Sequence, residues 1–307
     1  MRPILALFAG LTSVLAFAPL EVFLLAPLSL AALFWLMDGE SGSRRVALIG
    51  FCWGLGAFLA GVGWLFVAMH RYGGMAAPLA ALALLLFCAY LALYPAFMAW
   101  LYARLRRGGF WGDALLLASC WTVGELLRGW VFTGFPWLAI GYSQTSPSPL
   151  AGWAPVLGAY GLGFFVALFA ALLAKLLRGN WARVSLRWQV AALVLVIIST
   201  GAGLGQVRWT HPVGAPIAVA LLQTNVAQDQ KWQPGRLMDW LDLNYTLVER
   251  QKGARIVVLP ETSLPMLTEV LPIEPHVADT EKRPLADKPL LRMHSLQDFP
   301  DKYARFY

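Results

Sequence analysis

Glu261 is the residue whose type and position best suit acid–base chemistry. It stands in Leu259-Pro260-Glu261-Thr262, directly after the β-branched run Ile256–Leu259. A carboxylate at a strand end, flanked by apolar side chains, is partly desolvated, and this brings its proton affinity toward the range that is useful to a general base. The alternative is a turn carboxylate that accepts hydrogen bonds from backbone N–H groups. Spacing alone favours this second interpretation.

A second pair of ionisable residues lies within an apolar stretch. Glu125 and Arg128 are three residues apart, so on a helix they share a face and can pair, which lowers the cost of placing either at membrane depth. An internal ion pair that fixes helix packing and a contact to substrate are equally good interpretations. The loop 129–137 that follows is rich in aromatic residues, Gly and Pro. It is either an aromatic belt at the membrane interface or a loop that shapes a route for lipid.

The composition shows what kind of scaffold must position these residues. Of the 307 residues, 59% are hydrophobic and 13% are charged, whereas a soluble domain carries about 25% charged residues. Residues 1–210 hold 13 Lys/Arg and 5 Asp/Glu, a net of +8, and residues 211–307 hold 11 and 12, a net of −1. The composition excludes a soluble globular enzyme, a disordered protein and a nucleic-acid binder. It predicts an α-helical polytopic membrane bundle over 1–210 with a polar C-terminal segment.

Hydropathy predicts about seven spans, since crossing the hydrocarbon core takes about 17–25 apolar residues. The predicted spans are Pro3–Leu20, Val22–Met37, Val46–Ala68, Pro78–Tyr102, Ala114–Val131, Val156–Leu177 and Trp188–Leu204. The first two are short and are separated only by Pro19, Leu20 and Glu21, so we expect a tight helical hairpin.

The loop cations orient these spans. Ten of them lie in the N-terminus and the even-numbered loops: Arg2, Arg44, Arg45, Arg104, Arg106, Arg107, Lys175, Arg178, Arg183 and Arg187. The opposite side holds three: Arg71, Arg128 and Arg208. This bias predicts a cytoplasmic N-terminus and an outer C-terminal segment. A cleavable signal peptide ending at Ala16-Phe17-Ala18 is the alternative for the first span, and it leaves the C-terminal segment outside as well.

The polar segment has the pattern of an α/β unit. Ile217–Gln223 suits a buried strand, Arg236–Lys252 an amphipathic helix, and Ile256–Leu259 a second strand. Strand, helix and strand of these lengths predict a parallel crossover that places Glu261 at the carboxyl end of the second strand. The three cysteines, Cys52, Cys88 and Cys120, fall in predicted spans and match no metal site, so we expect neither a metal nor another cofactor.

Several runs of residues resemble the apolipoprotein N-acyltransferase family of the bacterial envelope. The runs lie in the expected order over about residues 1–266: Gly50-Phe51-Cys52-Trp53-Gly54, Gly73-Gly74-Met75, Glu125-Leu126-Leu127-Arg128-Gly129-Trp130, Thr133-Gly134-Phe135-Pro136-Trp137, Gly141-Tyr142-Ser143-Gln144, Gln223-Thr224-Asn225, Lys231-Trp232 and Leu259-Pro260-Glu261-Thr262. The resemblance implies a membrane-helix bundle joined to an extracytoplasmic nitrilase-like domain, which begins here over residues 211–266. It also implies a multi-pass protein of the bacterial inner membrane.

The resemblance further implies the reaction. The family transfers an acyl chain from a phospholipid donor to the free amine of a diacylated apolipoprotein, using a Glu–Lys–Cys triad and a thioester intermediate. Glu261 matches the family's base. Trp137 and Trp232 match tryptophans near the lipid-accessible side, and Glu125 and Arg128 are further candidates for lipid access.

The chain departs from the family pattern near residue 267. No cysteine follows Cys120, and the lysines after Glu261 are Lys282, Lys288 and Lys302, none in the family's lysine motif. The sequence predicts a chain that is truncated, or whose reading frame is lost, near residue 267, with a disordered tail over 267–307. We expect such a chain to be an inactive fragment. The alternatives are a non-catalytic membrane scaffold or lipid-binding remnant and, less favoured, a transporter.

Overall fold

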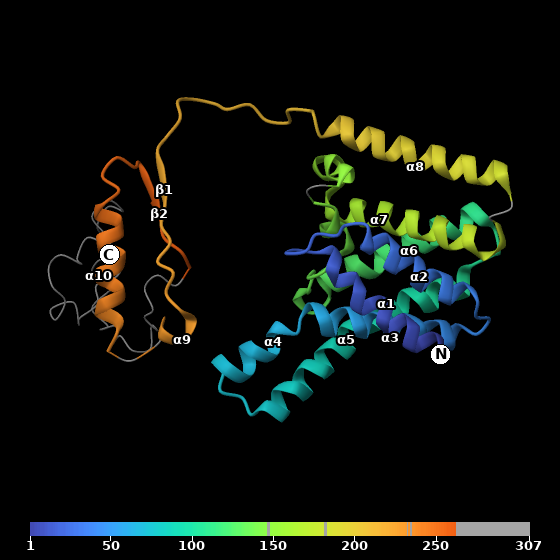
Figure 1. Ribbon diagram of the computed structural model, residues 1–307, viewed down its shortest axis with the longest axis horizontal. Coiled ribbons are helices and arrows are strands. Elements are labelled where there is room, and N and C mark those ends of the chain that lie inside the picture. The colour runs from blue at the N-terminus through green and yellow to red at the C-terminus, as the bar shows by residue number, and fades with distance from the viewer. Residues whose placement is uncertain (146–147, 181–182, 232, 234, 262–307) are drawn as a thin grey trace, which may run out of the picture. The chain divides into compact units, whose positions relative to one another are not determined.

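The first unit of the chain is a bundle of helices. A computed structural model describes residues 1–145, 148–180, 183–231, 233 and 235–261, and it divides the chain into two compact units after His211. Figure 1 shows the helices of the first unit lying side by side. They are α1 (Arg2–Ser13), α2 (Leu25–Asp38), α3 (Ser43–Gly61), α4 (Trp64–Val67), α5 (Ala77–Leu105), α6 (Phe110–Trp130), α7 (Ala154–Lys175) and α8 (Val184–Leu204). Short 3₁₀ turns over 131–133, 140–144 and 149–153 connect α6 to α7.

The helix lengths confirm a membrane bundle but correct the span count. Among the described residues, five helices are long and apolar enough to cross a membrane: α3, α5, α6, α7 and α8. The first two predicted spans form helices of only 12 and 14 residues. At 1.5 Å per residue these are about 18 and 21 Å long, shorter than the roughly 30 Å hydrocarbon core. The chain leaves helical geometry between them, where Pro19 lacks a backbone donor and Glu21 adopts a φ of 53°.

Small residues on α3, among them Gly54 and Gly56, let its neighbours approach closely. A Cβ at Gly54 would overlap the Pro95 ring of α5, and one at Gly56 would overlap the Leu7 carbonyl of α1. Accordingly α3 packs most extensively against α5 and α1. Close backbone approach of this kind is how membrane helices associate without a hydrophobic driving force.

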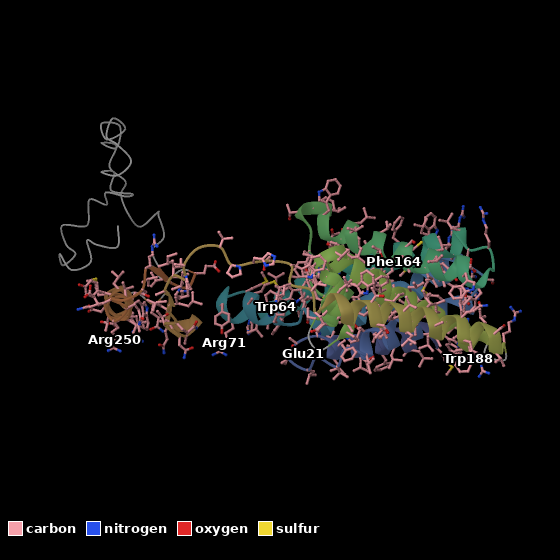
Figure 2. All side chains as sticks on the ribbon, turned by 90° about the horizontal axis from the view of Figure 1, so that it is seen from above. Glu21, Trp64, Arg71, Phe164, Trp188 and Arg250 are labelled. Carbon is pink, nitrogen blue, oxygen red and sulfur yellow. The ribbon has the colours of Figure 1, made fainter. Side chains whose placement is uncertain are left out.

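Contacts between distant residues gather the loop cations at one end of the bundle. Arg2 Nη1 donates to Glu40 Oε1 at 2.7 Å, and Arg106 Nη1 lies 3.5 Å from Asp38 Oδ1. Figure 2 shows Trp188, near the start of α8, at the opposite end of the bundle from Glu21 and Arg71. We call the Arg2 end the basic end. Its assembly agrees with the charge bias of the loops.

The second unit contains the predicted strand–helix–strand arrangement. Strand β1 (Val219–Leu221) pairs in parallel with β2 (Ile256–Val258), with Val219 opposite Ile256. The connection carries α9 (Gln228–Lys231) and α10 (Leu237–Glu249), and Leu241 of α10 is buried. The described part of this unit ends at Glu261, so the prediction of a disordered tail over 267–307 lies outside the described residues.

Candidate functional site

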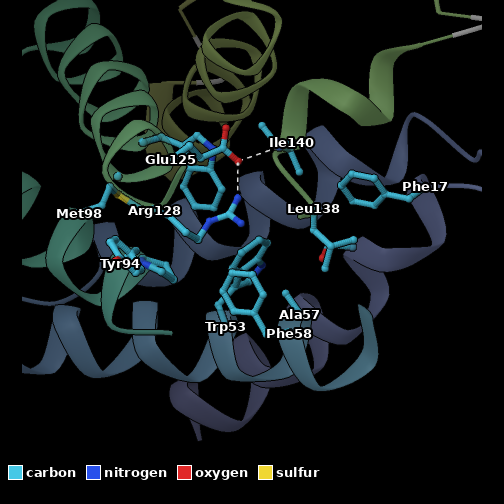
Figure 3. A pocket seen from close by; sticks show the side chains of 14 residues that line it. Phe17, Trp53, Ala57, Phe58, Tyr94, Met98, Glu125, Arg128, Leu138 and Ile140 are labelled. Atoms are coloured by element: carbon cyan, nitrogen blue, oxygen red, sulfur yellow. Dashed lines mark hydrogen bonds and ion pairs between the residues drawn. The ribbon is translucent and has the colours of Figure 1, made fainter. Parts of the chain in front are cut away.

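Glu125 and Arg128 form the predicted ion pair on α6. Their side chains are 6% and 4% exposed, and Arg128 Nη2 lies 3.8 Å from Glu125 Oε1. The spacing of three residues places both on the face of α6 that is buried in the bundle. Figure 3 shows the pair among side chains from several helices. The Arg128 guanidinium lies 5.3 Å from the centre of the Phe58 ring.

Both members of the pair also bind the backbone of the loop that follows α6. Arg128 Nη1 donates to the carbonyl oxygens of Phe135 at 2.7 Å and Trp137 at 2.5 Å. The Ile140 N–H donates to Glu125 Oε1 at 2.7 Å, and the Phe135 N–H donates to the Arg128 carbonyl. The ion pair therefore clamps residues 131–140 onto the helix, and we call Glu125 and Arg128 the loop clamp.

The clamped loop has an unusual backbone. Phe132, Thr133 and Leu138 adopt φ values of 53°, 71° and 59°. Non-glycine residues rarely occupy this left-handed region, and such conformations persist only where surrounding contacts determine them. The hydrogen bonds from Arg128 supply contacts of that kind. The loop is thus held in one shape by the clamp rather than by local sequence preference.

The clamp holds aromatic side chains at the surface of the bundle. Trp130 and Phe132 are more than 80% exposed, and Trp137 is half exposed. The Trp137 ring lies 5.7 Å from that of Trp64, which belongs to α4. These rings can occupy the headgroup level of a bilayer, where tryptophan is favoured. This agrees with both sequence interpretations of the loop, the aromatic belt and the lipid route.

The cavity beside the loop clamp is small. Its lining includes Tyr94 and Met98 together with the clamp itself (Figure 3). Trp121 also lines the cavity, whose volume is about 30 Å³. That space holds one or two water molecules, whereas a site for a drug-sized ligand occupies about 300–1,000 Å³. In this arrangement the clamp positions the loop and does not itself enclose a lipid chain.

The two remaining candidate residues, Glu261 and Trp232, belong to the second unit of the chain. Glu261 follows β2 directly and is exposed, and Lys231 Nζ donates to its backbone carbonyl oxygen at 3.0 Å. Because Glu261 is exposed, the expected desolvation by apolar neighbours is not seen among the described residues. Trp232 lies outside the described residues. The catalytic role of Glu261 stays a prediction.

A buried polar cluster follows the clamped loop, and residue types and spacing alone did not predict it. Ser143, Gln144 and Ser148 are each no more than 5% exposed. Ser148 Oγ donates to Gln144 Oε1 at 2.8 Å, and Gln144 Nε2 donates to the carbonyl oxygen of Phe23 at 3.2 Å. Gln144 thus connects this turn to the loop between α1 and α2. The run Gly141-Tyr142-Ser143-Gln144 was the only signal for it.

Comparisons with known proteins give the family. A family model described as the apolipoprotein N-acyltransferase N-terminal domain matches residues 9–172. A protein of Chromobacterium violaceum named apolipoprotein N-acyltransferase is 43% identical over 87% of this chain and 51% of its own length. Proteins of the same name from Nitrosomonas europaea and Ralstonia nicotianae are 42% and 44% identical, each over 88% of this chain and 53% and 51% of their own lengths.

The chain spans about half the length of these curated relatives. The family-model match covers the helical bundle through most of α7, which includes the loop clamp and the aromatic loop. Together, this match and the identity over most of the chain place the chain in the apolipoprotein N-acyltransferase family.

Proposed function

We propose that this chain supplies the membrane part of an apolipoprotein N-acyltransferase. Such an enzyme moves an acyl chain from a phospholipid to the amine of a diacylated N-terminal cysteine of a lipoprotein. The observation that carries the proposal is the identity of 42–44% over 87–88% of the chain. The substrates, a phospholipid and a lipoprotein, and the inner-membrane location come with it.

In this proposal the bundle presents a rigid aromatic surface to the bilayer. Phospholipid must leave the membrane at the headgroup level, and the exposed rings of Trp130, Phe132 and Trp137 suit that depth. The loop clamp fixes their positions, because Arg128 binds the loop carbonyls directly. Trp232, in the second unit, is proposed as a further lipid contact on the resemblance alone.

The proposed orientation places the basic end in the cytoplasm and the second unit on the outer face. The five long helices cross the membrane an odd number of times, and the short α1–α2 hairpin does not change this. Arg2, at the start of α1, donates to the carbonyl of Gly39, directly after α2, so the hairpin begins and ends at the same side. Reporter fusions at Arg106 and Gln206 should report the cytoplasm and the outer face respectively. Reports from the same side would contradict this topology.

Glu261 is proposed as the base that takes the proton from the attacking thiol of the family reaction. The thiolate would attack the phospholipid ester, and the lysophospholipid would leave as a thioester forms. The 307 residues hold no cysteine after Cys120, and the three they do hold lie in α3, α5 and α6. We therefore expect these 307 residues to contribute the scaffold and the base, and not the nucleophile.

A chimera separates the scaffold from the missing chemistry. Residues 1–261 are joined to the segment of the Chromobacterium violaceum relative that follows the position aligned with Glu261. The 307-residue chain in detergent, with phospholipid and a diacylated lipopeptide, should give no N-acylated product, whereas the chimera should give product. An inactive chimera that unfolds with the same midpoint as the chain would contradict the proposal and favour a non-catalytic lipid-binding protein.

Substitutions in the chimera test the base. Glu261→Gln should lower the rate of N-acylation by about 10²–10⁴-fold, the usual contribution of a general base. Glu249→Gln, a change of another exposed acid in the same unit, is the matched control and should leave the rate unchanged. Equal rates for both variants would remove Glu261 from the mechanism.

A further inference from the structure

An ionic network crosses the basic end of the bundle. Lys175 Nζ lies 3.3 Å from Asp113 Oδ2 and 3.8 Å from Asp38 Oδ2. The Tyr102 hydroxyl donates to Asp38 Oδ1 at 3.0 Å, and Arg106 lies 3.5 Å from the same oxygen. The network joins α2, α5, α6 and α7, whose ends meet here (Figure 1).

Both carboxylates of this network are satisfied by groups of the protein. Asp113 also accepts hydrogen bonds from the backbone N–H groups of Arg107 and Gly108, at 3.0 and 3.1 Å. Asp38 has Lys175, Arg106 and Tyr102. Two cations, Lys175 and Arg106, therefore neutralise the two anions, and neither carboxylate is left to pair with a further arginine.

Arg178 and Arg183 add positive charge to the same place. Arg178 donates from Nε and Nη2 to the carbonyl oxygen of Trp35 and stacks over its ring at 4.5 Å. These contacts fix the guanidinium and leave its Nη1 group for another acceptor. Arg183 is exposed. Within the part of the chain that the structure describes, neither arginine forms an ion pair with a carboxylate.

These side chains surround a large polar cavity. Its lining holds four cations, Arg106, Lys175, Arg178 and Arg183, and two anions, Asp38 and Asp113, so the lining carries a net charge of +2. The volume is about 420 Å³, within the range of about 300–1,000 Å³ that small-ligand sites occupy. A cavity with surplus fixed cations between membrane helices, at the basic end of a bundle, is the environment that lipid headgroups occupy.

We propose that this cavity, here called the basic cavity, binds a phosphate-bearing anion, with Arg178 and Arg183 as its charge-pairing residues. The source is the headgroup of an anionic phospholipid in the leaflet that adjoins the basic end. A phosphodiester carries one negative charge, and guanidinium groups match phosphate oxygens in geometry. This site lies apart from the loop clamp and the aromatic loop, and it does not depend on the acyltransferase proposal.

Lipid binding to the full chain tests the proposal. The purified 307-residue chain in non-ionic detergent is titrated with phosphatidylglycerol and, separately, with phosphatidylcholine, and bound lipid is counted by native mass spectrometry. The variants are Arg178→Gln/Arg183→Gln and the control Arg44→Gln/Arg45→Gln. The control removes the same two charges from exposed arginines at the start of α3, and these lie outside the cavity lining.

We expect wild type to prefer phosphatidylglycerol. The cavity variant should bind it about 30-fold more weakly, since each cation near a lipid headgroup contributes about fivefold, and the control variant should bind like wild type. Arg178 also contacts Trp35, so its loss can disturb folding. Arg183→Gln alone keeps the test decisive, because Arg183 is exposed, and it should weaken binding about fivefold with an unchanged unfolding midpoint.

Equal losses of binding in the cavity and control variants would overturn the proposed site. Equal binding of the two lipids by wild type would overturn its assignment to a lipid headgroup and, without phosphate binding that requires the two arginines, the site as well. Inorganic phosphate is the second probe and distinguishes the source of the ligand. Phosphate binding that requires Arg178 and Arg183, without a preference for phosphatidylglycerol, would support the anion site and assign it to a soluble phosphate compound. A lipid preference that requires both arginines assigns it to the membrane.

Discussion

The loop clamp and the basic cavity are both built from arginine and carboxylate side chains, but these side chains have different roles. At the loop clamp one arginine faces one glutamate, and Nη1 of Arg128 donates to two loop carbonyls next to a cavity of about 30 Å³. At the basic cavity two cations neutralise two aspartates, and two more arginines face a space of about 420 Å³.

The difference shows when charge inside a helical bundle serves folding and when it can serve binding. A charge whose partners are protein groups, with room beside it for no more than one or two water molecules, fixes structure. A surplus charge beside an open polar space keeps its capacity to bind an anion. Removing one partner of a closed pair leaves an uncompensated buried charge, which is strongly destabilising. Removing a surplus charge leaves no carboxylate without its cation, and it weakens ligand binding.

The largest effect is expected at the loop clamp. Arg128→Met should lower the free energy of unfolding by about 3–5 kcal/mol, because Glu125 is left buried without its cation and the carbonyls of Phe135 and Trp137 lose their donor. The free energy of unfolding is measured by titrating the protein, purified in a mild detergent, with a denaturing detergent. Arg44→Met, the same change at an exposed site, is the control.

The second step of this test restores neutrality. Glu125→Gln together with Arg128→Met removes both charges and should recover part of the lost stability, since no charge is then buried alone. A loss below about 1 kcal/mol for Arg128→Met alone would erase the contrast between the two regions.

A smaller loss is expected for Lys175→Met at the basic cavity, about 1–3 kcal/mol. Asp113 keeps its two backbone hydrogen bonds, and Asp38 keeps Arg106 and Tyr102, so neither carboxylate is left alone. The same unfolding assay applies, with Lys252→Met at an exposed position as the control. A loss as large as that of Arg128→Met would mean that the basic cavity is as closed as the clamp.

Salt gives the smallest effect and sharpens the comparison further. Phosphatidylglycerol binding should weaken a few-fold as sodium chloride is raised from about 0.05 to 0.5 M, because the screening length falls below about 10 Å and Arg183 is exposed. The loss of stability in Arg128→Met should stay constant, because a buried pair is screened little. Equal salt dependence of the two quantities is the contradicting result.

Local sequence patterns predicted the elements of this protein well. Apolar length placed the five long helices, and the spacing of Glu125 and Arg128 predicted their pairing. The run from Ile217 to Leu259 predicted a parallel strand pair with a helix in the connection. Each of these features depends on periods of two to four residues along one segment. The hydropathy pattern was wrong in length for the first two helices, where Pro19 and Glu21 end regular structure early. It also ran past the end of α3 at Gly61.

The sequence by itself thus determined a basic membrane bundle, its helices, the Glu125–Arg128 pair and the family motifs. Only the tertiary structure decided what the charged residues contact. Lys175 contacts Asp113, which is 62 residues away in the sequence, and Arg178 contacts Trp35, which is 143 residues away. The reason is physical: a side chain's partner on another helix depends on how both helices rotate and pack, and no local period encodes that. For the same reason only the folded bundle shows that Arg128 donates to carbonyls of the loop that follows its own helix, whereas Arg178 and Arg183 line a polar cavity.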